Sequence, residues 1–560
     1  MEFEHRYFGR TRAETGPLQS ALAFAPDLLR PPTHFQGKVD KRLPFREGMA
    51  ALHAVVVSDH RPQQKDRTAY LEWRAQQDDL ELAELIAGAP QLKADLTARA
   101  AHLRADLHQV VQERSKSANA FYRARGRYFS WLWENDRGAW VVLDPVVTVH
   151  PDQIFFECFS QDESAYGRFG CAYDAFRKVD AFECGTTNVD YSKKLAAEFE
   201  KVRTYRDTTL SVDPAGFTVQ TDQDDAHHEK KIDLPDGWVR GFLQVSAAMT
   251  LPGVQLRLDP IDLHNLLFVL KRKRETHGPR SLRFHFSPQG GISVTVEPFG
   301  IVQHLRRSTV VANRGHDGQP ITEVRLWGRR RLLVLERLIP VAKHLDVTLL
   351  GSGMPSFWVT RMGGMDFTLG LSGWTANDWS RAGAFDLMAP RGEVDTHTSE
   401  RVYQALRSSW FAKPDRLASQ LDLARSTVEA ALIRESQAGR TVFDVVRKVW
   451  RARELFNRPL PLDHLRFSNE HEARAHTLVQ ERKVLGFQQQ ARGTKRLLSG
   501  QVQDRSSVRR PTVTLDADDR MVAATCTCGH YVRNKLHYGP CAHILALRMT
   551  AGAQQAGVSA

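Results

Sequence analysis

Three cysteines and one histidine lie close together near the C-terminal end of this 560-residue chain, as Cys526-Thr-Cys528 and, after twelve residues, Cys541-Ala-His543. Half of the six cysteines are in this segment. Three thiolates and one imidazole fill the four positions of a tetrahedral zinc ion and leave none for water, which is typical of a structural site. The spacing therefore predicts that Cys526, Cys528, Cys541 and His543 bind Zn²⁺ and organise a small fold.

The segments on both sides of these residues also fit a small metal-stabilised fold. Residues 511–515 and 521–525 are predicted strands, because each holds β-branched residues and an Asp-rich turn separates them. After the last ligand, residues 544–548 begin a helix. His530 and His537 lie between the two ligand pairs and could compete for one coordination position.

This arrangement resembles the SWIM-type zinc finger, whose pattern is C-x-C, a variable insert, and C-x-H leading into a short helix. The resemblance covers about residues 498–550 and implies that the ligands are the two short pairs, with none between them. Large bacterial proteins with such a finger resemble components encoded with MoxR-type AAA+ ATPases and von Willebrand factor A-domain proteins. That resemblance implies a protein-docking adaptor, with an AAA+ ATPase as one partner.

A second motif lies at residues 416–434. Leu417 and Leu421 give a short amphipathic helix, a turn follows, and Ser426 can cap a second helix that ends before Gly439. The segment is similar to the winged helix-turn-helix of bacterial transcription regulators. The resemblance implies that the second helix enters the major groove of DNA.

The outward residues of this second helix include Arg425 and Arg434, which could contact DNA, but acidic residues lie among them. A winged helix that docks protein therefore stays open beside one that binds DNA. A further helix is expected after the motif, with basic residues that could contact a phosphate backbone. These residues are Arg440, Arg447, Lys448, Arg451 and Arg453.

The positive charge of the chain indicates polyanionic partners. Its formal net charge is +12 and its pI is near 9.4, and basic residues gather beside the predicted finger, where Asp504 is the single acid between residues 492 and 510. We therefore expect DNA or RNA as a partner. The candidate contacts in and beside the finger are Lys495, Arg496, Arg509, Arg510, Arg533 and Lys535.

The length predicts several domains, and the fold class is expected to be multidomain α+β. Residues 70–133 have the apolar spacing of a helical hairpin. Short β-branched and aromatic runs after Trp140 predict a mixed α/β region, with helices at about 260–275 and 329–344. The expected units are an N-terminal helical region (1–139), a mixed α+β domain (140–395), a winged-helix-like segment (396–460), a linker (461–497), a zinc finger (498–550) and a flexible tail (551–560).

The chain shows no motif of a known enzyme class, with no Gly-x-Ser-x-Gly elbow, His-Glu-x-x-His or Walker sequence. No secretion signal, membrane-spanning run or lipidation site is recognisable, so we expect a cytoplasmic protein. Cys158, Cys171 and Cys184 lie among aromatic residues, and we expect buried, reduced thiols there. The sequence thus predicts a zinc-binding interaction protein that is not an enzyme.

Overall fold

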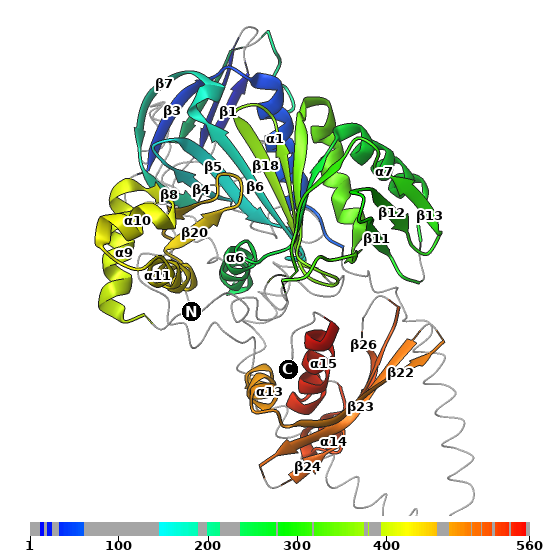
Figure 1. Cartoon of the computed structure of the whole chain (residues 1–560). Helices are drawn as coiled ribbons and strands as arrows, with labels where there is room; N and C mark the ends of the chain where they lie inside the picture. The colour runs from blue at the N-terminus through cyan, green and yellow to red at the C-terminus, as the bar shows by residue number, and fades with distance from the viewer. Residues whose placement is uncertain are drawn as a thin grey trace, which may run out of the picture. The chain divides into compact units, whose positions relative to one another are not determined.

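A computed structural model gives the fold of this chain (Figure 1). It holds a body within residues 12–455 and a C-terminal module within residues 470–555, which are treated separately below. The helical hairpin expected at 70–133 lies outside the described residues. The structure describes residues 33–60, 145–188, 199–205, 207–212, 236–275, 278–315, 318–373, 379, 394–455, 470–493, 495–505, 507–517, 521–536 and 539–555, and the backbone of 12–15 and 19–24.

The described residues of the body form four sheets. The first has the order β1 (Arg12–Thr15), β2 (Gln19–Phe24), β9 (Asp207–Val212), β3 (His34–Val39), β7 (Phe176–Glu183). The second has the order β14 (Thr309–Asn313), β10 (Val254–Leu258), β16 (His344–Leu349), β17 (Ser356–Arg361), β18 (Met365–Leu371), β6 (Ala165–Ala172), β5 (Gln153–Phe159), β4 (Val146–Val149), β8 (Gly185–Asn188).

The other two sheets of the body are smaller. The third has the order β13 (Ile301–His304), β12 (Ile292–Val296), β11 (Ser281–Phe286), β15 (Glu323–Trp327). The fourth has the order β19 (Phe411–Ala412), β21 (Val449–Ala452), β20 (Thr441–Asp444). The helices of the body are α1 (Arg42–Val56), α6 (Asp236–Ala248), α7 (Pro260–Arg272), α9 (Thr396–Ser409), α10 (Pro414–Leu421) and α11 (Arg425–Gln437), with the 3₁₀ helices η1 (Tyr173–Ala175) and η2 (Arg329–Val341).

One continuous apolar core joins segments for which the sequence predicted separate domains, with boundaries at residues 139 and 395. It runs from Phe35 on β3 to Leu455 after β21. The strand β3 pairs with both β7 and β9, and α1 packs on β5 and β6. The described parts of the regions 1–139, 140–395 and 396–460 therefore fold together, because each supplies apolar faces that the others cover.

The helix expected at 260–275 is confirmed as α7, which Asp259 caps by accepting from the backbone N–H of Ile261 and which begins at Pro260. The helix expected at 329–344 is instead the 3₁₀ helix η2. Pro340 lies inside it and has no N–H for an α-helical bond. Within η2, Arg331 is buried and donates to the carbonyl oxygens of Ser164 and Gly373.

The prediction of buried thiols is confirmed for two of the three cysteines outside the finger. Cys158 and Cys171 are fully buried in the nine-stranded sheet, and burial raises the pKa of both thiols. Cys184 is only partly buried. In the described part of the chain, no helix is long and apolar enough to cross a membrane.

The C-terminal module consists of a twisted sheet with helices on one face. Its cores join Leu498, Val502 and Val513 of the sheet to Ile544 and Leu547 of the last helix. The elements are α13 (Glu470–Gln480), β22 (Val484–Arg492), β23 (Lys495–Asp504), β24 (Ser507–Arg509), β25 (Thr512–Leu515), β26 (Met521–Thr525), α14 (Gly529–Asn534) and α15 (Ala542–Gln555).

This module is larger than the predicted finger at both ends. The segment 461–497, predicted as a linker, supplies α13 and β22, because Ala475 and Leu478 are buried against α15 and β23. The helix α15 also continues through Gln555, into the predicted tail at 551–560. The strands predicted at 511–515 and 521–525 are confirmed as β25 and β26.

Candidate metal centre

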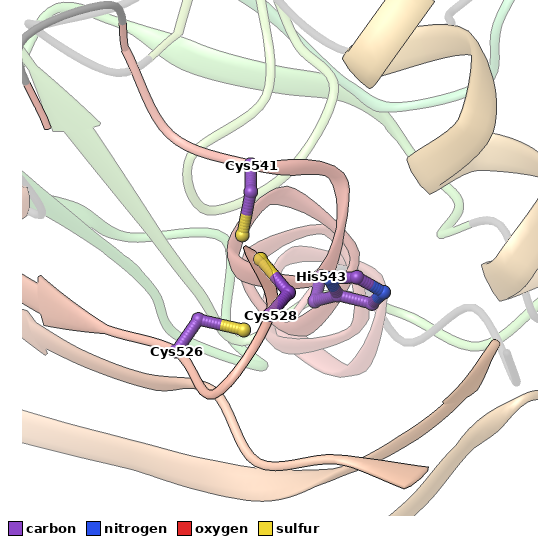
Figure 2. A group of neighbouring side chains, drawn as sticks. All are labelled: Cys526, Cys528, Cys541 and His543. Atoms are coloured by element: carbon purple, nitrogen blue, oxygen red, sulfur yellow. The ribbon is translucent and has the colours of Figure 1, made fainter. Parts of the chain in front are cut away.

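Four side chains predicted as ligands meet at one end of the sheet of the C-terminal module. Cys526 follows directly after β26, and Cys528 caps α14 by accepting from the backbone N–H of Tyr531 at 3.4 Å. Cys541 immediately precedes α15, and His543 lies in its first turn. All four are buried, and Figure 2 shows the three sulfur atoms turned towards one another.

The geometry of these four groups fits a zinc ion. Their ligand atoms all lie within 4.8 Å of one another. A tetrahedral zinc with bonds of about 2.3 Å separates sulfur ligands by roughly 3.8 Å, so small side-chain movements complete the site. In addition, Nδ1 of His543 is buried without a hydrogen-bond partner. A buried polar atom of this kind indicates a missing ligand, here the metal.

Of the three thiols, hydrogen bonding favours the deprotonated form of Cys541. The pKa of Cys541 is lowered, because the thiol of Cys526 donates to its sulfur and the backbone N–H of Ile544 at the start of α15 points at it. The pKa of Cys526 is raised in turn. A thiolate at a helix N-terminus is a good metal ligand, so Cys541 is the thiol most ready to bind. Zinc binding removes the remaining protons and ties metal affinity to pH.

Asp504 at the end of β23 orients the histidine ligand. Its carboxylate accepts from Nε2 of His543 at 3.1 Å and also from the guanidinium of Arg474 on α13. Because Nε2 carries the proton of this bond, Nδ1 is the nitrogen left for the metal. Such carboxylate–histidine–metal arrangements fix the ring and raise its basicity. In the sequence, Asp504 stands out only as the single acid in a basic segment. Its role could not be predicted there, because it is separated from His543 by 39 positions in the chain.

One of the two histidines between the ligand pairs, His530, has a different position. His530 on α14 stacks edge-to-face on His471 of α13, with ring centres 4.4 Å apart. It is not among the four side chains that converge in the described residues. His537 lies outside the described residues. The contact of His530 therefore joins α14 to α13 instead of competing for the metal.

Four of the predicted basic contacts surround the loop that carries Cys526 and Cys528. Arg509 donates to the carbonyl oxygen of Thr527 at 3.5 Å, and the backbone N–H of Arg510 donates to the Thr527 hydroxyl at 3.0 Å. Arg533 on α14 donates to the carbonyl oxygen of Gly529 at 3.2 Å, and the ammonium of Lys535 lies 5.3 Å from the ring centre of Tyr531. Arg509 and the backbone of Arg510 thus contact the loop itself, whereas Arg533 and Lys535 contact residues of α14.

The other two predicted contacts lie further along the sheet. Lys495 is exposed at the start of β23, opposite Arg492. Arg496 pairs with Leu515 and is half-buried, and burial lowers its pKa. Because strand residues rise about 3.3 Å each, Lys495 is roughly 13 Å along β23 from Ser499, which pairs with Thr512 near the metal end. The structure therefore separates Lys495 and Arg496 from the other four.

In the segment similar to a helix-turn-helix, α10 and α11 form where the sequence expects them, but α11 is largely covered. It packs against α9 and α6, and its side chains from Ala430 to Ile433 and at Glu435 are buried. Arg434 donates to the carbonyl oxygen of Val394 and to the hydroxyl of Thr396. The exposed Arg425 pairs with Glu429 and Asp415.

The basic residues expected on a helix after α11 instead lie on or beside the hairpin of β20 and β21. Two are buried in ion pairs with the body: Arg451 with Asp152 at 2.8 Å, and Arg453 with Glu157 at 2.9 Å. Asp444 accepts from Arg451 Nε at 2.7 Å. Since buried ions are retained only when paired, these arginines hold the hairpin on the nine-stranded sheet and are unavailable to a phosphate backbone.

Comparisons with known proteins support the metal centre. Residues 512–547 match the family model of the SWIM zinc finger. A search of curated proteins gave no match. Among solved structures, Proliferating Cellular Nuclear Antigen from Entamoeba histolytica matches with 9% identity and a TM-score of 0.29, covering 41% of this chain and 89% of that one. The structure of the C-terminal region of FEN-1 bound to A. fulgidus PCNA matches with 12% identity and a TM-score of 0.27, covering 41% of this chain and 88% of that one. Both TM-scores are too low to assign a fold or function here.

Proposed function

We propose that the C-terminal module is a zinc-stabilised unit that binds DNA or RNA through the sheet face opposite α13 and α15. Leu498, Val502 and Val513 point towards the helices, so their neighbours along each strand point outward. None of these outward residues is acidic. In register across the sheet they are Gln490, Leu497, Thr514 and Ala523, followed by Gln488, Ser499, Thr512 and Thr525.

The observation that carries this proposal is the placement of cations at both ends of this face. Arg492 and Lys495 lie at one end, and Arg510 lies at the metal end, whereas Arg509 pairs with Val502 and points to the helix side. The side-chain amides and hydroxyls between these cations can donate hydrogen bonds to the phosphates of a nucleic-acid backbone, and the cations can neutralise their charge. No aromatic residue stands among the outward residues named above, so contacts to phosphates, rather than stacking on bases, would supply the affinity.

The test is binding of the full chain to labelled single- and double-stranded DNA and RNA over a salt series, measured by fluorescence anisotropy. We expect affinity that falls steeply with salt and is lost in Cys541→Ala and in the double variant Lys495→Ala, Arg510→Ala. The matched control is Arg425→Ala, Arg434→Ala, which removes the same charge from the body. The proposal is contradicted if the unaltered chain does not bind, or if its affinity does not change with salt concentration.

The second candidate is a protein-docking adaptor with an AAA+ ATPase as partner. Its support is the segment α9 to β21, whose order of helix, strand, helix, helix and two-stranded hairpin we interpret as a winged helix. Because α11 is covered by α6 and the hairpin is held by Arg451 and Arg453, this winged helix serves as a scaffold and does not read DNA. Copurification of an ATPase with a tagged chain after nuclease treatment tests the adaptor, and its absence argues against it.

Both candidates are binding functions, and we propose that the chain is not an enzyme. A zinc ion held by three thiolates and one imidazole has no open position for a substrate or water. The metal would act by joining β26 and α15 to α14, which has no buried residue of its own.

A further inference from the structure

A groove of about 420 Å³ lies on the body between α7 and β13, far in sequence from the metal centre. The two sides are joined by Gln303, whose Nε2 donates to the carbonyl oxygen of Asn265 at 3.3 Å. The side chains and backbone that line it come from Asn265, Phe268 and Val269 on α7 and from Gln303, His304 and Leu305 on and after β13.

The groove has an uncovered apolar surface. Phe268 is 50% exposed, and Ile261, two turns earlier on the same face of α7, is 51% exposed. β13 is also the edge strand of its sheet, so the backbone groups on one of its sides have no strand partner in the described chain. An apolar helix face beside a free strand edge is a surface that another chain can cover.

The charges around the groove are positive. The guanidinium of Arg272 lies 4.7 Å from the ring centre of Phe268, and Arg306 and Arg307 are exposed just after β13. The two nearby acids are already engaged. Asp262 is buried and accepts from the hydroxyl of Ser308 at 2.7 Å, and Asp259 accepts from Nε of Arg307 at 3.0 Å. A ligand that reaches this groove therefore meets an apolar surface with cations beside it.

We propose that this groove binds an acidic, extended segment of a partner protein. The segment adds to the free edge of β13 through backbone hydrogen bonds, as in known strand-addition complexes. One of its apolar side chains packs on Phe268, and its carboxylates lie near Arg272 and Arg306. The charge complementarity selects an acidic partner over a basic one. This site is independent of the proposed nucleic-acid face, which lies in the C-terminal module.

The experiment uses the full chain and a fluorescein-labelled ten-residue peptide in which Glu and Asp alternate with Leu and Phe. Binding is measured by anisotropy, with two comparison peptides that carry Lys for the acids or Ser for the apolar residues. We expect saturable binding of the acidic peptide alone. Phe268→Asp should weaken it about tenfold or more. The matched control Phe182→Asp, which changes an exposed phenylalanine on β7, should leave it within about twofold.

A charge-reversal variant provides a second test. Arg272→Glu should lose the acidic peptide and gain affinity for the Lys peptide, a result that misfolding cannot produce. Circular dichroism melts check each variant. The proposal is overturned if the acidic peptide does not bind, if Phe268→Asp and Phe182→Asp behave alike, or if the Ser peptide binds as well as the acidic one. None of these results depends on whether the chain binds nucleic acid.

Discussion

The carboxylate of Asp504 accepts a hydrogen bond from Nε2 of His543 at 3.1 Å, and this contact determines which nitrogen of the histidine is available to a metal. Arg474 of α13 holds the same carboxylate. The orientation of the ligand therefore depends on two residues that precede the C-x-C pair in the sequence.

Asp504→Ala should lower zinc affinity about 10- to 100-fold, because the ring of His543 loses the partner that orients it and raises its basicity. Competition with a chromogenic chelator measures this affinity. Asp174→Ala, at an exposed aspartate of the body, is the matched control. Unchanged zinc affinity in Asp504→Ala would show that His543 is oriented by other contacts.

Removal of zinc by a chelator, or the substitution Cys541→Ala, should make residues 470–555 sensitive to protease. The free energy of structural zinc binding is largely folding free energy in so small a unit. Limited proteolysis followed by mass spectrometry locates the cuts, and added zinc should restore resistance only to the unaltered chain. The control is Cys184→Ala. Cuts confined to the body would contradict a structural role of the metal.

Each phosphate-binding cation contributes about one unit to the salt dependence of nucleic-acid affinity. Lys495→Ala and Arg510→Ala should each reduce the slope of log affinity against log salt by about this amount. Arg434→Ala should leave the slope unchanged, because its guanidinium is already bonded to Val394 and Thr396. A reduced slope in Arg434→Ala would mean that α11 separates from the body when nucleic acid binds.

Burial, with the nearby guanidinium of Arg451, lowers the pKa of His150 to about 3. The unfolded chain takes up a proton at this histidine near pH 6.5, whereas the folded chain stays neutral. Stability should therefore fall as the pH is lowered from about 6.5 towards 3, by at most about 1.4 kcal/mol per pH unit. Urea unfolding of unaltered chain and His150→Gln measures this, with His264→Gln as the exposed control. Parallel pH profiles for the unaltered chain and His150→Gln would exclude this linkage.

Some of this structure could be predicted because the determining signals are local. The convergence of the four candidate ligands follows from the spacing of two short pairs, and β25, β26 and α7 follow from composition, turns and a cap. In contrast, α13 carries only Ala475 and Leu478 as fully buried residues, which is too weak a pattern to distinguish a packed helix from a linker. The roles of Asp504 and of the arginines beside β21 depend on partners 39 to about 300 residues away in the chain, and no local pattern reports such pairings.

The burial of α11 also affects how relatives of this chain should vary. In a helix that reads DNA, the outer residues contact the bases, so relatives that recognise the same DNA sequence keep them. The inner face of such a helix changes only from one apolar residue to another. Here Ala430 and Ala431 are buried, and α6 covers α11. Relatives should therefore keep small side chains at positions 430 and 431, or change them together with residues of α6. Position 425, at the exposed end of α11, should vary without such a constraint.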